Sequence, residues 1–264
     1  MSGLPAPATE LVPANRGSGS AAALTVREVS VRFGGINALT GVSFDAAVGQ
    51  ITGLIGPNGA GKTTTFNVIT GLEQPTAGSV EILGTDASRL RPHLRARLGL
   101  ARTFQRLEVF GSLSVRDNIL TGAEFHRSWS SDAANPQQTT DEVLARVGLE
   151  EVAHLRVDSV PTGTARLVEL GRALATRPRL LLLDEPGSGL DESESKALGR
   201  LLVDLAASGL AVLLVEHDVG LVMSICQRVH VLNFGILIAS GTPTEVQGDA
   251  TVQAAYLGGT VEGT

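Results

Sequence analysis

The segment Gly56-Pro57-Asn58-Gly59-Ala60-Gly61-Lys62-Thr63 carries the strongest structural signal in the chain. The apolar run 51–55 before it predicts a buried strand, and residues 64–69 after it predict the first turns of a helix. A strand, a glycine-rich loop and a helix in this order form the setting of a phosphate-binding loop. In such a loop, backbone N–H groups and the positive end of the helix face the phosphates. A lysine binds the β- and γ-phosphates, and a threonine hydroxyl binds Mg²⁺. We therefore expect phosphate contacts from Gly56, Pro57, Asn58, Gly59, Ala60, Gly61, Lys62, Thr63 and Thr64.

The alternative is a glycine-rich turn that ends in Lys-Thr by chance. Lys62 and Lys196 are the only lysines among the 264 residues. A chance lysine at this one point is therefore rare, and the phosphate-binding interpretation is favoured.

Composition excludes several classes of protein. The net charge of -6 argues against a nucleic-acid binder, which normally carries a basic surface. The single cysteine, Cys226, excludes an internal disulfide framework and is typical of a reducing compartment; its apolar neighbours indicate packing rather than chemistry. No apolar run approaches the roughly 20 residues that cross a bilayer, and the N-terminus lacks the pattern of a secretory signal. Any work at a membrane must therefore go through a partner.

The first third of the chain is expected to be rich in strands. Residues 1–23 are dominated by Pro, Ala, Gly and Ser and predict a disordered tail. Short strands are expected at 24–26, 29–33 and 42–44, broken by Gly34-Gly35 and Gly41, and another at 79–83. Six arginines then crowd one stretch, which we interpret as a solvated helix face rather than a nucleic-acid or phospholipid patch: Arg89, Arg91, Arg95, Arg97, Arg102 and Arg106.

The rest of the chain alternates helices and strands. Helical spacing over 113–151, with a polar loop at 130–140, predicts a helical insertion. The continuous apolar runs 180–183 and 211–215 are typical of parallel strands covered on both faces. A helix from Glu192, short strands at 229–232 and 236–238, and a helix at 252–257 complete the expected pattern.

Two carboxylates follow a buried strand directly, where ligands collect in α/β sheets. We expect Asp184 to hold Mg²⁺ through its water shell and Glu185 to accept a proton from an attacking water. A carboxylate pair without a cation is costly, which implies a metal; two surface acids at a strand end are the alternative. His217 ends the next apolar strand and is placed to donate a hydrogen bond to the γ-phosphate.

With these motifs in order, residues 24–259 resemble the ATP-binding cassette (ABC) family. The resemblance implies an α/β fold: a P-loop NTPase core with a parallel sheet, an N-terminal antiparallel β subdomain, a helical subdomain inserted at about 107–176, and a tail at 260–264. It also implies that Phe33 stacks on adenine, that Gln105 contacts Mg²⁺ and reports nucleotide state to a membrane partner, and that His217 is the switch histidine. The loop 188–191, ending at Asp191, matches the one that crosses to a second subunit.

A narrower resemblance is to the ATPase subunits of branched-chain amino acid importers and of related urea and short-amide importers. It is carried by Arg102-Thr103-Phe104-Gln105, Glu216-His217-Asp218, Gly241-Thr242-Pro243 and Ala255-Tyr256-Leu257-Gly258. It implies ATP and Mg²⁺ as cofactors, a second ABC ATPase subunit, two transmembrane permease subunits and, indirectly, an extracytoplasmic solute-binding protein. The chain would then lie on the cytoplasmic face of the membrane, and the permease would dock near 105–123 through Leu107, Val109, Phe110, Leu113 and Val115.

The signature that clamps ATP across a dimer departs from the family pattern. It commonly reads Leu-Pro-Tyr-Gly-Gln-Gln-Arg in this subfamily, whereas residues 160–166 read Val-Pro-Thr-Gly-Thr-Ala-Arg. Gly163 and the following helix can still approach phosphate, so we expect a weakened clamp opposite a partner with an intact signature. Two alternatives stay open: a nucleotide sensor with little catalysis, and a soluble family member that acts on ribosomes or chromosomes.

Overall fold

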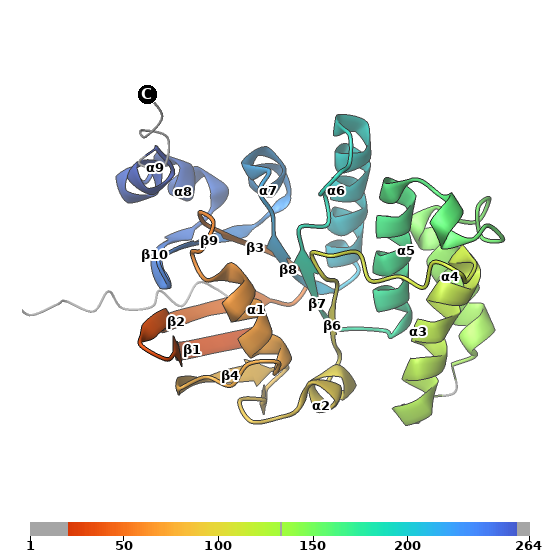
Figure 1. Ribbon diagram of the computed structural model, residues 1–264, viewed down its shortest axis with the longest axis horizontal. Helices are drawn as coiled ribbons and strands as arrows, with labels where there is room; N and C mark the ends of the chain where they lie inside the picture. The colour runs from red at the N-terminus through yellow and green to blue at the C-terminus, as the bar shows by residue number, and fades with distance from the viewer. Residues whose placement is uncertain (1–20, 133, 258–264) are drawn as a thin grey trace, which may run out of the picture.

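The computed structural model describes residues 21–132 and 134–257, which form two sheets and the helices packed around them (Figure 1). The first sheet is antiparallel in the order β2-β1-β4-β5 and contains β1 (Ala22–Phe33), β2 (Ile36–Ala47), β4 (Ala77–Ile82) and β5 (Thr85–Asp86). The second sheet has the order β10-β9-β3-β8-β7-β6, with β10 antiparallel and its other pairs parallel. Its strands are β3 (Ile51–Ile55), β6 (Leu100–Arg102), β7 (Leu180–Asp184), β8 (Ala211–Val215), β9 (Arg228–Asn233) and β10 (Ile236–Gly241).

Helix α1 (Lys62–Thr70) lies beside both sheets, and α2 (Pro92–Arg97) precedes β6. Between β6 and β7 the chain forms α3 (Val115–Trp129), α4 (Pro136–Val147), the short 3₁₀ helix η1 (Val157–Ser159) and α5 (Thr162–Ala175). The C-terminal part adds α6 (Glu192–Ala207), α7 (Val219–Ile225), α8 (Pro243–Gly248) and α9 (Ala250–Leu257). In the described part of the chain, no helix combines the length and the apolarity needed to span a membrane.

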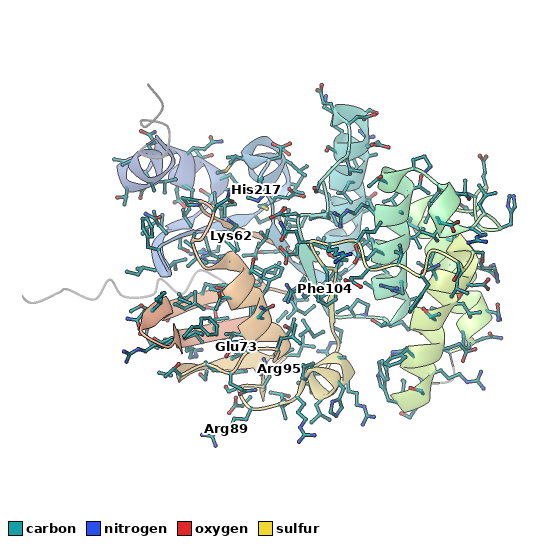
Figure 2. All side chains as sticks on the ribbon, viewed as in Figure 1. Lys62, Glu73, Arg89, Arg95, Phe104 and His217 are labelled. Carbon is teal, nitrogen blue, oxygen red and sulfur yellow. The ribbon has the colours of Figure 1, made fainter. Side chains whose placement is uncertain are left out.

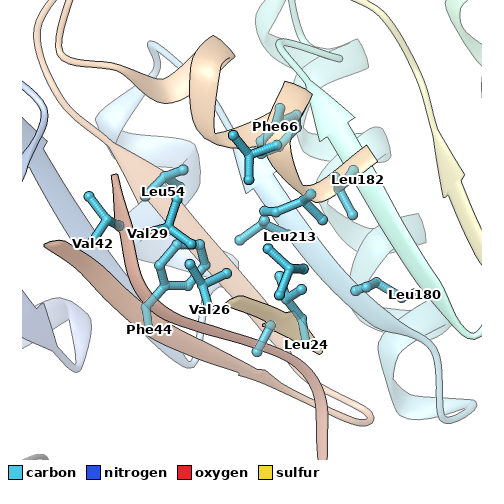
Figure 3. Packing of buried hydrophobic residues seen from close by; sticks show 14 of the residues in the cluster. Leu24, Val26, Val29, Val42, Phe44, Leu54, Phe66, Leu180, Leu182 and Leu213 are labelled. Atoms are coloured by element: carbon cyan, nitrogen blue, oxygen red, sulfur yellow. The ribbon is translucent and has the colours of Figure 1, made fainter. Parts of the chain in front are cut away.

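Strand β7 explains why the parallel sheet is buried on both faces. Alternate strand residues point to opposite faces, and Leu180 and Leu182 enter the core shared by the two sheets and α1 (Figure 3). Leu181 and Leu183 enter a second core formed with residues of α5 through α9. All four side chains are fully buried, which stabilises the fold by about 2 kcal/mol each. The predicted α/β fold, with a parallel sheet, an antiparallel sheet and inserted helices, is confirmed.

The N-terminal strands are longer than the sequence predicts. Gly41 does not end a strand; it lies inside β2 with φ 60°, beside a register shift in the β1–β2 pairing. A glycine with positive φ relieves an irregularity of this kind without breaking the ladder. Strand β1 begins at Ala22, within the predicted tail of 1–23; residues 1–20 of that tail, and the predicted tail at 260–264, lie outside the described residues.

The inserted helices have their own core, and the predicted boundaries of 107–176 enclose α3, α4 and α5. The loop expected at 130–140 is shorter than predicted because α4 begins at Pro136. Its N-cap, Asn135, accepts a hydrogen bond from the Gln137 amide, and proline suits the first helical position.

The prediction of a solvated arginine face is wrong for two of its six members. Arg89, Arg91, Arg97 and Arg106 are exposed, but Arg95 is fully buried. Its guanidinium donates to the carbonyls of Val68 (2.6 Å) and Ile69 (2.8 Å) in the last turn of α1. The second exception, Arg102, belongs to the candidate site described below.

Candidate nucleotide site

The phosphate-binding loop lies at the C-terminal end of β3 and leads into α1, whose N-cap is Gly61. A Cβ on Gly56 would lie 2.1 Å from the Leu232 carbonyl oxygen, so the loop can approach β9 this closely only with glycine at this position. The Lys62 ammonium folds back on the loop and donates to the carbonyls of Gly56 (2.7 Å) and Pro57 (3.0 Å). Burial lowers the pKa of Lys62, while the carboxylates of Glu185 and Asp184 act in the opposite direction.

A pocket of about 440 Å³ lies over this loop. Strand β2 contributes Ile36, Asn37 and Ala38, and the turn after β9 contributes Phe234. Val215 also lines the pocket, and most of the predicted site residues do so too: Asn58, Gly59, Ala60, Gly61, Lys62, Thr63, Thr64, Gln105, Glu185 and His217. Lys62 and His217, which are far apart in sequence, lie near each other in the centre of the molecule (Figure 2).

Glu185 is held by two side chains from different parts of the chain. The Gln105 amide nitrogen donates to Glu185 Oε2 (3.1 Å), and His217 Nε2 lies 2.8 Å from Glu185 Oε1. Strands β7 and β8 are paired in register up to Asp184 and Val215, so the residues that follow them emerge side by side. Glu185 also has φ 52°, a backbone conformation that is uncommon for residues with a side chain.

Asp184 pairs with a positively charged side chain of the chain itself, which the sequence did not predict. Arg102, at the end of β6, forms a buried ion pair with Asp184 Oδ2 (2.9 Å) and donates to Asn67 Oδ1 (2.8 Å) on α1. Its guanidinium also lies over the Phe104 ring, 4.9 Å from the centroid. The argument that the two carboxylates need a metal for charge balance is therefore wrong, because Arg102 and Lys62 already supply positive charge.

The residues nevertheless suit a magnesium ion bound with nucleotide. Thr63 and Gln105 line one pocket with oxygen-bearing side chains, and Arg102 engages only one of the two Asp184 oxygens. Mg²⁺ prefers oxygen ligands and usually binds through one or two protein groups together with substrate phosphates. Among the described residues no cluster of three or more His, Cys, Asp or Glu is arranged to hold a metal, so phosphates would have to complete the shell.

Six of the predicted site residues lie outside the pocket lining: Phe33, Gly56, Pro57, Asp184, Gly163 and Asp191. Phe33 is half exposed at the end of β1. Gly163 lies in the first turn of α5 and faces Glu194 of α6. Asp191 caps α6 by accepting from the Glu194 amide (2.8 Å). The parts expected to reach a second subunit thus lie close together where α5 meets α6, and Gly163 is buried there.

Glu216 is a site residue that the sequence analysis passed over. It is buried beside the pocket and accepts hydrogen bonds from the amides of Gly187 (2.5 Å) and His217 (3.1 Å). Burial raises the pKa of its carboxyl group. It therefore ties the loop after Glu185 to the loop that carries His217. Its position as the first polar residue after a continuous apolar strand is the sequence feature that could have identified it.

The loop that carries Gln105 is fastened to α5. Glu169 accepts from the amides of Phe104 and Glu108 (3.3 Å each), and Arg166 donates to the carbonyls of Phe104 (3.2 Å) and Gln105 (2.9 Å). Desolvation raises the pKa of the Glu169 carboxyl group, and these hydrogen bonds partly offset the rise. The position of Gln105 therefore depends on the helix that begins at the altered signature.

A groove of about 660 Å³ runs between α2 and β6 on one side and α3 and α5 on the other. Of the residues expected to dock a permease, Val115 is fully buried, and Leu107 and Val109 pack against the core of the inserted helices. Phe110 and Leu113 are exposed, and Phe110 lines the groove together with Val109. The apolar surface at this place is therefore smaller than the sequence suggests.

Comparisons with known proteins agree with this geometry. A family model described as ABC transporter matches residues 39–188, and one described as branched-chain amino acid ATP-binding cassette transporter matches residues 237–262. The high-affinity branched-chain amino acid transport ATP-binding protein LivG of Salmonella typhimurium is 36% identical over 252 residues, covering 89% of this chain and 97% of LivG.

The lipopolysaccharide export system ATP-binding protein LptB of Escherichia coli is also 36% identical, over 237 residues, covering 90% of this chain and 98% of LptB. Among solved structures, an ATP-binding cassette of an ABC transporter superposes with a TM-score of 0.81 at 28% identity, covering 90% of this chain and 99% of that one. The matched sequence spans the phosphate loop and both carboxylates. The chain therefore belongs to the ABC transporter family and is an ATPase subunit of that family.

Proposed function

We propose that Glu185 is the general base that activates water for attack on the γ-phosphate of ATP, and that His217 and Gln105 hold it in position. The observation that carries this proposal is the pair of contacts to Glu185, at 2.8 Å and 3.1 Å, in the pocket that also contains Lys62. A base must be oriented by its neighbours, and the two contacts to Glu185 supply that orientation.

The other pocket residues bind and orient the nucleotide. The backbone amides of residues 58–63 and the N-terminus of α1 face the phosphates, and Lys62 exchanges its loop carbonyls for phosphate oxygens. Thr63, Gln105 and Asp184 are the residues that would hold Mg²⁺, which neutralises phosphate charge when bound. Phe33, Gly163 and Asp191 lie outside the pocket, and their predicted roles in contacting adenine and a second nucleotide remain part of this proposal.

The transport assignment extends the catalytic one. We propose an importer of branched-chain amino acids or of related small polar solutes such as urea and amides. The match of residues 237–262 to the branched-chain family supports this choice, although LptB, named for export, is equally identical to this chain. The chain would act on the cytoplasmic face with two permease subunits, a second ABC ATPase subunit and, indirectly, an extracytoplasmic solute-binding protein. The groove beside Phe110 is the proposed permease site.

A second candidate is a catalytically weak, nucleotide-sensing subunit that works opposite an intact ATPase. The altered signature favours it, because Thr164 and Ala165 replace the two glutamines expected after Gly163. Ala165 is buried in the core of the inserted helices, so its position contributes packing rather than a polar contact. The retained contacts to Glu185 favour the catalytic candidate.

Two measurements on the purified chain and its Glu185→Gln variant separate the candidates. They are the rate of phosphate release and the extent of dimerisation at saturating ATP. For the catalytic candidate we expect turnover by the native chain and a loss of about 100-fold or more in the variant, which should accumulate an ATP-bound dimer. Glu192→Gln, which changes an exposed carboxylate on α6, is the matched control. A native chain that binds ATP but neither hydrolyses it nor dimerises would favour the sensor.

A further inference from the structure

The turn between β9 and β10 places an aromatic residue in an unfavourable backbone conformation. Phe234 and Gly235 form a two-residue connection between the paired residues Asn233 and Ile236, with φ 44° and 75°. Two positive φ values in a hairpin turn favour Asn-Gly, and a bulky residue at the first position is strained. The Phe234 side chain is 84% exposed, so packing within the chain does little to offset that strain.

The turn is fastened to the phosphate-binding loop. The Gly235 amide donates to the Ala60 carbonyl (2.9 Å), and the Gly235 carbonyl accepts from the Thr40 amide of β2 (2.8 Å). These bonds fix the turn between the loop and β2. Phe234 consequently lines the same pocket as Lys62.

The pocket lining combines the phosphate loop with apolar side chains, which are those of Ile36, Ala38 and Phe234. Ile36 is 73% exposed, so both large apolar side chains, Ile36 and Phe234, are open to solvent. Strained backbone of this kind clusters at ligand sites, and an aromatic ring beside a phosphate site suits the flat face of a nucleobase.

We propose that Phe234 is a base-binding residue that contacts the nucleobase together with Ile36 when the triphosphate lies on the loop. Phe33, the aromatic residue that the family resemblance places against adenine, lies outside the lining of this pocket, and Phe234 is a base contact in addition to it. The inference rests on the proposed binding of phosphate by residues 56–64. Because stacking depends on ring area, ATP and GTP should bind with similar affinity and both more tightly than CTP.

The test compares ATP with inorganic tripolyphosphate, which carries the phosphates without a base. Dissociation constants of both are measured by calorimetry on the full chain. Phe234→Ala should weaken ATP binding about 10-fold and leave tripolyphosphate binding unchanged. Phe234→Trp should retain ATP affinity. Ile236→Ala, which removes an exposed apolar side chain outside the pocket, is the matched control.

Phe234→Asn separates binding from folding. Asparagine suits the turn, so this variant should unfold at a higher urea concentration than the native chain while binding ATP as weakly as Phe234→Ala. Unchanged ATP affinity in both variants would overturn the proposal, as would an equal loss for ATP and tripolyphosphate. A native chain that binds tripolyphosphate as tightly as ATP would have no base site although its phosphate site stands, and one that binds neither would overturn the phosphate site itself.

Discussion

His230 is buried in the parallel sheet, where burial lowers the pKa of its imidazole from 6.5 to about 4. Its Nε2 lies 3.3 Å from the Asp45 carbonyl oxygen, and its ring packs against Phe44. A histidine whose pKa is lower in the folded than in the unfolded chain makes its full contribution to the free energy of unfolding above pH 6.5. Protonation of the unfolded chain removes that contribution as the pH falls toward 4.

Between pH 7.5 and pH 5 we therefore expect the His230 contribution to the free energy of unfolding to fall by about 2 kcal/mol. Urea unfolding of the native chain and of His230→Gln at both values measures it, because other titrating groups cancel in the difference. His93→Gln, at an exposed histidine, should behave as the native chain does. If the free energy of unfolding depended on pH equally in the native chain and in His230→Gln, the lowered pKa of His230 would be contradicted.

At the scale of the element, α1 depends on a side chain distant in sequence. Arg95 donates to two carbonyls at the end of α1 and to the carbonyls of Leu90 (2.9 Å) and Ser88 (3.2 Å). The hydrogen bonds to Val68 and Ile69 are buried, and a buried carbonyl that loses its donor costs about 1–3 kcal/mol. The helix that presents the phosphate loop is thus held at its far end by a buried cation.

Arg95→Met should lower the free energy of unfolding by about 3 kcal/mol, since methionine fills part of the space but donates no hydrogen bonds. Urea denaturation measures the change. Arg97→Met, at an exposed position of the same short helix, should change stability little. Similar losses in both variants would mean that charge, rather than the buried hydrogen bonds, accounts for the effect.

At the scale of the whole molecule, the altered signature at residues 160–166 and the loop that carries Gln105 are connected through α5. The helix begins at Thr162, and its residues Arg166 and Glu169 hold the loop that carries Gln105. A change in how a second subunit meets the start of α5 would therefore reach Gln105 and, through it, Glu185. In the proposed dimer, this connection would make the signature relevant to hydrolysis as well as to assembly.

Thr164→Gln should increase ATP-dependent dimerisation severalfold, because it restores a long polar side chain at a half-exposed position in the first turn of α5. Light scattering on the Glu185→Gln background, with and without ATP, measures it. Ser159→Gln, at an exposed position before the helix, is the matched control. Equal dimerisation by both variants would show that side-chain identity at 164 does not limit assembly.

The order of the short motifs along the chain made much of the site predictable. Residues at the ends of neighbouring parallel strands must meet at one edge of the sheet, so apolar runs followed by Asp184-Glu185 and by Glu216-His217 were enough to place Glu185 and His217 together. The same logic could have found Glu216. The assignment failed for Arg95 and Arg102, because sequence spacing cannot distinguish a solvated arginine from one that binds buried carbonyls or a buried carboxylate.

The sequence alone therefore predicted the class of fold, the phosphate loop and the candidate base, because these depend on strand order and on short motifs with their own backbone geometry. Tertiary structure decided which charges are neutralised and which aromatic ring lines the pocket. Arg102 reaches Asp184 from another strand, and Phe234 reaches the pocket from a turn more than 170 residues beyond Lys62. Such contacts depend on how the sheets and loops pack together, and no local pattern in the chain encodes them.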